Sequence, residues 1–85
     1  MPKFTLNFHG NLLAYLQQCF ENRAVPKVYT TSKNLDEHMN SLNNRGTALR
    51  VMEVTDHYVV LAEKPDSGPS FIVAMSAIVG YGFGA

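Results

Sequence analysis

The fold class of this chain is decided by residues 46–83, which read GTALRVMEVTDHYVVLAEKPDSGPSFIVAMSAIVGYGF. Extended runs rich in valine, isoleucine and aromatic residues alternate here with short breaks at Asp56-His57, at residues 64–69 and before Ile78. Such spacing predicts strands that are joined by tight turns. We therefore expect a meander of four strands that bends into a small barrel or finds partner strands.

An amphipathic helix is predicted ahead of this segment, at residues 11–23. Apolar residues from Leu12 to Cys19 recur at spacings of three and four, with polar residues between them. Asn11 is suited to cap the first free amides of such a helix. The helix must end before Pro26, because the residue that precedes a proline is pushed out of the helical region.

Two further segments lead up to the strand-rich half. Residues 25–31 are rich in β-branched and aromatic side chains and predict the first strand. Residues 32–45 are polar and dense in asparagine, with apolar residues at helical spacing, and predict an inserted loop or short helix that ends at Gly46. Before the first helix, an alternation of apolar residues indicates a short strand or arm, formed by Phe4, Leu6 and Phe8.

The totals suit one small domain that spans residues 1–85. Hydrophobic residues make up 46% of the chain, which is ordinary for a globular protein whose single core is only just large enough. Seven basic and seven acidic side chains give a net charge of zero, so the chain has no global attraction to nucleic acid. The lone cysteine and the lack of a signal-like or membrane-length apolar run favour a cytoplasmic protein without membrane contact.

No catalytic or metal-binding constellation stands out from the sequence. His9, His38 and His57 are far apart and lack the spacing of metal ligands. Ser67 lies in an Asp-Ser-Gly-Pro run, where the surrounding residues are those of a turn rather than of a nucleophile site. Cys19 lies on the apolar face of the predicted helix, as an inert core thiol would. We therefore predict a protein that is not an enzyme and that holds no metal and no cofactor.

Two stretches carry a family resemblance. The first is Leu16-Gln-Gln-Cys-Phe-Glu-Asn-Arg-Ala-Val-Pro-Lys-Val-Tyr29, and the second is Glu53-Val-Thr-Asp-His-Tyr-Val-Val-Leu61. They resemble the Sm-like family, especially its bacterial Hfq branch, in the helix with its Val-Pro strand entry and in a hairpin where an Asp precedes an aromatic residue by two positions. Ala77-Ile78 is similar to an Ala-Ile pair of the same family. The similarity covers residues 11–31 and 46–83.

The resemblance implies a mainly β fold with an N-terminal helix, in the form of a small, strongly bent, five-stranded barrel. It also implies a homo-oligomeric ring of six or seven subunits, in which the fourth strand of one subunit pairs with the fifth of the next and no sheet edge stays open. At the pore of such a ring, single-stranded RNA binds without being cleaved, as in RNA processing or regulation, and its bases stack on an aromatic side chain. The RNA-binding positions that the resemblance implies are Asp56, His57, Tyr58, Met75 and Ser76.

The sequence also departs from the family pattern. Ala74, Met75 and Ser76 stand where Hfq has a Tyr-Lys-His cluster, so the base donors and the cation of that cluster are missing. The loop after the first strand is longer than in the family and lacks the expected glycine. These departures favour an alternative, a structural ring or scaffold that has lost its RNA contacts and binds a protein partner through residues 32–45. That alternative predicts indifference to Tyr58, and a monomer would instead make Tyr58 a core residue.

Overall fold

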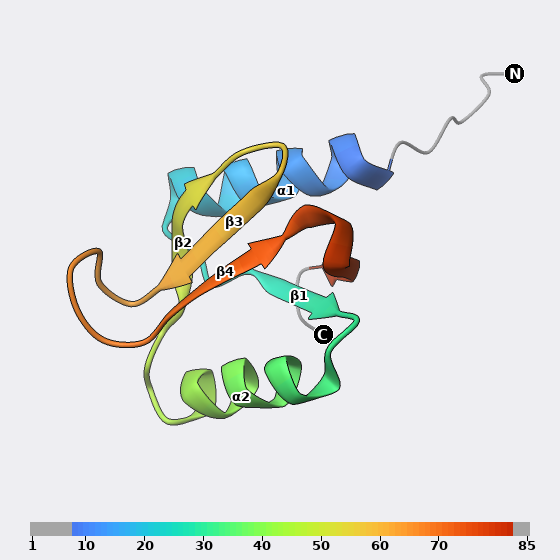
Figure 1. The fold of residues 1–85 in the computed structure, drawn as a ribbon. Helices are drawn as coiled ribbons and strands as arrows, with labels where there is room; N and C mark the ends of the chain where they lie inside the picture. Colours follow the sequence, from blue (N-terminus) through green and yellow to red (C-terminus); the bar gives the residue numbers. More distant parts are fainter. Residues whose placement is uncertain (1–7, 83–85) are drawn as a thin grey trace, which may run out of the picture.

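A computed structural model describes residues 8–82 of the chain (Figure 1). An N-terminal helix is followed by five strands, and a second helix is inserted after the first strand. The elements are α1 (Phe8–Asn22), β1 (Lys27–Thr30), α2 (Lys33–Asn44), β2 (Arg50–Val54), β3 (Tyr58–Ala62), β4 (Ser70–Ala74), the 3₁₀ helix η1 (Met75–Ala77) and β5 (Ile78–Gly82).

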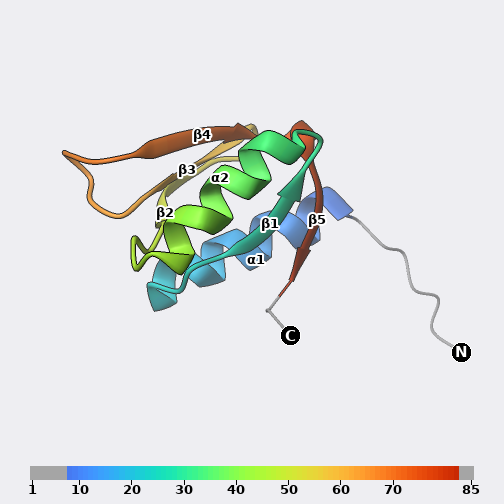
Figure 2. The same ribbon diagram turned by 90° about the horizontal axis from the view of Figure 1, so that it is seen from below.

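The five strands form two antiparallel sheets. Strands β2, β3 and β4 are neighbours in chain order, and β1 pairs with β5. The two helices lie on opposite sides of the strands, and α2 stands over the gap between β1 and β2 (Figure 2). The prediction of an N-terminal helix with five strands is therefore confirmed. Within residues 8–82 the strands do not close into a barrel, because no ladder joins β1 to β2.

Helix α1 supplies one wall of the hydrophobic core. It begins at Phe8, three residues earlier than the apolar spacing predicts, and packs against β2. Its side chains Leu12 and Leu16 are fully buried, and Cys19 on the same face is 2% exposed. The predicted core position of this thiol is thus confirmed, and burial raises its pKa. The core further contains Met39, Leu49, Val51, Val59, Leu61, Val73, Met75 and Ile78.

Tyr15 fastens α1 to the sheet formed by β1 and β5. Its hydroxyl donates a hydrogen bond to the carbonyl of Gly82 at 2.8 Å and accepts one from the amide of Lys27 at 2.9 Å. Lys27 and Gly82 are partners in the β1–β5 ladder, so the hydroxyl bridges the last step of that ladder. Desolvation raises the pKa of Tyr15, which keeps the hydroxyl protonated and able to donate.

Helix α2, the segment predicted as a loop or short helix, is bounded by a capping motif at each end. The side chain of Ser32 accepts a hydrogen bond from the amide three residues later, as an N-cap does. At the other end Gly46 has a φ of 92°, its amide donates to the carbonyl of Asn43, and the amide of Thr47 donates to the carbonyl of Leu42. This is a Schellman motif, and glycine suits it because a positive φ is strained for other residues.

Two polar side chains of α2 bond to backbone amides on either side of the gap between the sheets. The amide of Thr30, at the end of β1, donates to both carboxylate oxygens of Asp36 at 3.0 Å, and the Thr30 hydroxyl lies 2.9 Å from Oδ1. The amide of Leu49, just before β2, donates to Oδ1 of Asn43 at 3.0 Å. Asp36 and Asn43 are about two turns apart on the helix, so one face of α2 serves both amides.

The alternating residues Phe4 and Leu6 lie outside the described part of the chain. Neither α1 nor α2, the two α-helices among residues 8–82, combines the length and apolar character that crossing a bilayer requires.

We predict that Asp36→Ala lowers the free energy of unfolding by about 1–3 kcal/mol, because it leaves the buried amide of Thr30 without a partner. Urea unfolding followed by circular dichroism measures this change. Glu37→Ala is the matched control, since Glu37 is exposed on the same turn of α2 and should shift stability by less than about 0.5 kcal/mol. Equal stabilities of the two variants would show that α2 is not anchored through Asp36.

Candidate functional site

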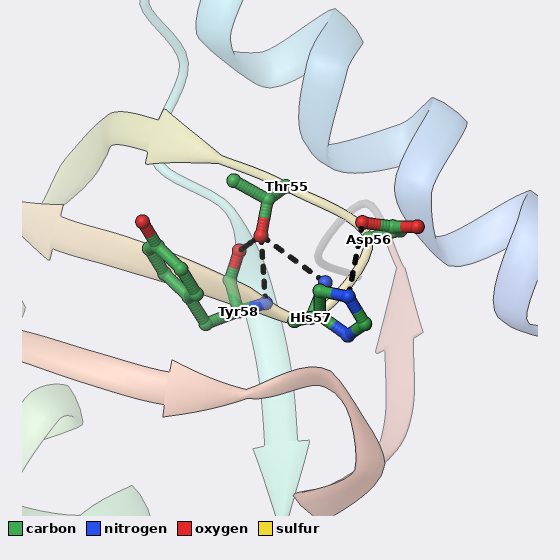
Figure 3. A network of polar contacts seen from close by, with 4 residues as sticks. All are labelled: Thr55, Asp56, His57 and Tyr58. Atoms are coloured by element: carbon green, nitrogen blue, oxygen red, sulfur yellow. Dashed lines mark hydrogen bonds and ion pairs between the residues drawn. The ribbon is translucent and has the colours of Figure 1, made fainter.

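The predicted site residues Asp56 and His57 form the two-residue turn between β2 and β3. Thr55 organises this turn, and Figure 3 shows the contacts that its hydroxyl makes. Its backbone amide donates to the carbonyl of Tyr58 at 2.9 Å. The hydroxyl of Thr55 accepts hydrogen bonds from the amides of His57 and Tyr58, each at 3.1 Å. One threonine thus accepts from two backbone amides at the hairpin end, so the Asp56 and His57 side chains are not needed there and face solvent.

The carboxylate of Asp56 and the imidazole of His57 lie next to each other on the surface. Oδ1 of Asp56 is 3.8 Å from Nε2 of His57, and most of each side chain is exposed. The phenol of Tyr58 lies on the other side of the hairpin end, away from both (Figure 3). The three consecutive residues therefore present two separate surfaces, one polar and one aromatic.

The β3–β4 ladder, in which Tyr58 pairs with Ala74, brings the second predicted segment beside this turn. The amide of Met75, the first residue of η1, donates to the carbonyl of His57 at 2.9 Å. The Met75 side chain is 3% exposed and belongs to the core, whereas Ser76 is exposed. The structure thus places Asp56, His57 and Ser76 at one end of the molecule, with the Met75 side chain turned into the core.

Tyr58 is partly exposed, and its hydroxyl donates a short hydrogen bond to Oε2 of Glu53. Glu53 pairs with Val60 in the β2–β3 ladder, so Tyr58 is its diagonal neighbour on the adjacent strand. The Glu53 carboxylate raises the pKa of Tyr58, first by accepting the phenolic hydrogen and second by repelling a phenolate. This contact positions the phenol at the surface of the sheet, where the Tyr58 side chain is partly exposed.

Sequence reasoning missed two contributors to the site, Thr55 and Glu53. A threonine directly before a two-residue break is typical of turns in which a hydroxyl bonds the following amides. Glu53 required the register of the hairpin, which includes an irregularity between Val51 and Glu53 that no periodicity reveals. Among residues 8–82 no group of three or more His, Cys, Asp or Glu converges as metal ligands would.

No protein family, no curated protein and no solved structure matches this chain. The likeness to Sm-like proteins therefore rests on the two sequence stretches and on the order of the elements.

We predict that Tyr58 loses its proton above the ordinary phenol pKa of 10.0, because Glu53 favours the protonated form. The difference in ultraviolet absorbance between wild type and Tyr58→Phe isolates this titration. In Glu53→Gln the midpoint should move to lower pH. Because the pKa of Tyr58 is raised in the folded state, the Tyr58–Glu53 contact stabilises the fold below pH 10. This stabilisation is lost as pH rises through the raised pKa. An unchanged midpoint in Glu53→Gln would contradict the assignment.

Proposed function

We propose that this chain is a non-catalytic subunit that binds single-stranded RNA and assembles into a homo-oligomeric Sm-like ring of six or seven copies. The observation that carries the proposal is the hydrogen bond between the Met75 amide and the His57 carbonyl, since it joins the two segments that the family resemblance implies for RNA binding. In a ring, each subunit would contribute one such end to the pore.

The chemistry of this end suits bases better than phosphates. Tyr58 offers a partly exposed ring fixed by Glu53, and a base stacked on an aromatic side chain gains about 1–3 kcal/mol. On the separate polar surface, Asp56 and Ser76 offer hydrogen-bonding groups to a neighbouring nucleotide of the same strand. None of the five implied positions is a lysine or arginine, so repetition of the site around a ring would have to supply the affinity that these positions do not gain from positive charge.

Ring assembly is supported by two open sheet edges. Strand β4 has a partner on one side only, as does β5, among the described residues. Each edge carries an aliphatic side chain in solvent: Ile72 on β4 is 74% exposed, and Val79 on β5 is 61% exposed. Exposed edges with apolar side chains invite pairing with another chain. Pairing β4 with β5 of a neighbouring copy would close both edges and complete a bent barrel-like wall.

A second candidate function is a ring or scaffold that binds a protein partner through residues 32–45. The observation that favours it is the cleft of about 600 Å³ between α2 and β1, which lies apart from the β2–β3 turn. Neutral charge and the missing Tyr-Lys-His cluster also fit this function.

For RNA binding we predict that Tyr58→Ala weakens the affinity for uridine- or adenosine-rich oligonucleotides by about 1–3 kcal/mol per stacked base. Fluorescence anisotropy of a labelled oligonucleotide, repeated at several salt concentrations, measures the affinity. Salt should weaken the binding through its phosphate component. Phe20→Ala is the matched control, because Phe20 is also an exposed aromatic residue but lies on α1. Equal losses in both variants, or no binding by wild type, would reject the RNA site.

For the ring we predict a native mass of six or seven times 9.4 kDa, unchanged across a range of salt. Size-exclusion chromatography with light scattering measures it. Ile72→Asp should shift the protein to smaller species, because a carboxylate on the edge of β4 would lose its hydration in the contact. A wild-type monomer would overturn the ring and leave Tyr58 as an isolated surface residue.

A further inference from the structure

The edge of β1 that faces away from β5 opens into the cleft between β1 and α2. All residues from 25 to 29 line this cleft, although the side chains of a strand alternate between its two faces. A strand that faced the cleft with its side chains would line it only with every second residue. Because consecutive residues line the cleft, β1 faces it with its backbone edge. Within residues 8–82, no strand pairs with that edge.

The hydrogen bonds of Thr30 and Thr31 identify which backbone groups of β1 point into the cleft. The amide of Thr31 donates to the Ala77 carbonyl, toward β5, whereas the amide of Thr30 donates to Asp36, toward α2. Backbone groups alternate along a strand, so those of Val28 point the same way as the Thr30 amide. Val28 therefore offers one N–H donor and one C=O acceptor to whatever enters the cleft.

Helix α2 prevents β2 from occupying this place. Asp36 holds the far end of β1, and Asn43 holds the amide of Leu49 immediately before β2. The two contacts keep β1 and β2 apart, with Leu49 and Leu61 at the bottom of the space between them. The floor is apolar, while exposed polar side chains of α2, such as Asn40 and Asn44, form the rim.

The charge of the cleft favours one class of partner. Among the described residues that line it, Asp36 and Glu37 are acidic and Lys27 is basic, and the Asp36 carboxylate already accepts hydrogen bonds from Thr30. The exposed Glu37 carboxylate therefore remains to repel the phosphates of a nucleic acid and to attract a basic side chain. A chain with alternating apolar and basic residues matches an apolar floor beneath an acidic rim.

We propose that this cleft binds an extended, basic peptide segment of a partner protein, which adds as a strand to the open edge of β1. A residue of the peptide exchanges two hydrogen bonds with Val28, the next apolar side chain rests on Leu49 and Leu61, and a lysine or arginine reaches Glu37. In strand addition, backbone hydrogen bonds give affinity and alternate side chains give specificity. This inference rests on the second candidate function, a protein partner at residues 32–45, and is independent of the RNA site.

The test begins with a displayed library of peptides of about eight residues, selected against the full-length wild-type protein. The same selection against Asn40→Trp, which fills the cleft, serves as the counter-target. Asn34→Trp is the matched control, because Asn34 is an exposed asparagine of α2 that does not line the cleft. Thermal melts followed by circular dichroism establish that both variants are folded.

We expect enriched peptides to carry alternating aliphatic and basic residues. Their affinity should fall about tenfold or more in Asn40→Trp and stay within about twofold in Asn34→Trp. A weaker effect of Glu37→Gln should appear only for peptides that carry a lysine or arginine. Enrichment that is equal on the Asn40→Trp counter-target, or absent altogether, would overturn the partner site and the second candidate function with it.

Two measurements on the wild-type protein then separate strand addition from other modes of binding. Two versions of the peptide are compared, one N-methylated at its odd-numbered residues and the other at its even-numbered residues. Only the version that loses the N–H groups facing β1 should fail to bind. In the complex, hydrogen exchange of the Val28 amide should slow, because that amide gains an acceptor. If both N-methylated versions bind as tightly as the unmodified peptide, and hydrogen exchange at Val28 is unchanged, strand addition is overturned while the partner site itself is retained.

Discussion

The arrangement of this small protein depends on the way α2 keeps two strands apart. An unpaired backbone amide next to a buried core is costly, so the amides of Thr30 and Leu49, at the borders of the gap between β1 and β2, need acceptors. Asp36 and Asn43 supply them, one at the end of β1 and the other just before β2. Without α2 the two strands would be free to satisfy each other. With it, the strands divide into a pair and a triplet.

The divided sheet has a consequence for the surface of the molecule. A closed barrel leaves no edges, whereas two short sheets leave four. One edge of β1 faces the cleft under α2, and the outer edges of β4 and β5 face solvent with Ile72 and Val79 on them. These edges are the places where another polypeptide would bind most readily. Their separation allows self-association and capture of a partner peptide to use different parts of the same chain.

The end of the molecule that holds Asp56, His57 and Ser76 is stabilised by contacts between residues that are close in the sequence. There the Thr55 hydroxyl accepts from the amides of His57 and Tyr58, and the β3–β4 ladder, continued by the bond from the Met75 amide to the His57 carbonyl, holds η1 beside the turn. The side chains of Asp56 and His57 are consequently not needed to stabilise the turn. Tyr58 differs, because the hydrogen bond of its hydroxyl to Glu53 restricts the orientation of its ring. A held ring loses less conformational entropy when a ligand stacks on it.

Local chemistry in the sequence by itself determined the elements of this protein. Helical spacing around Leu12 and Cys19 marked α1, the Asp56-His57 break marked the hairpin, and Gly46 marked the end of α2, because each depends on interactions between near neighbours in the chain. Only the tertiary structure decided which strands pair. The β1–β5 ladder joins residues far apart in sequence, and whether β2 also pairs with the other edge of β1 depended on where Asp36 and Asn43 came to lie. The same holds for the site: the residue types around Tyr58 were visible in the sequence, but the contact of Met75 with His57 and the burial of the Met75 side chain arise from packing between distant segments.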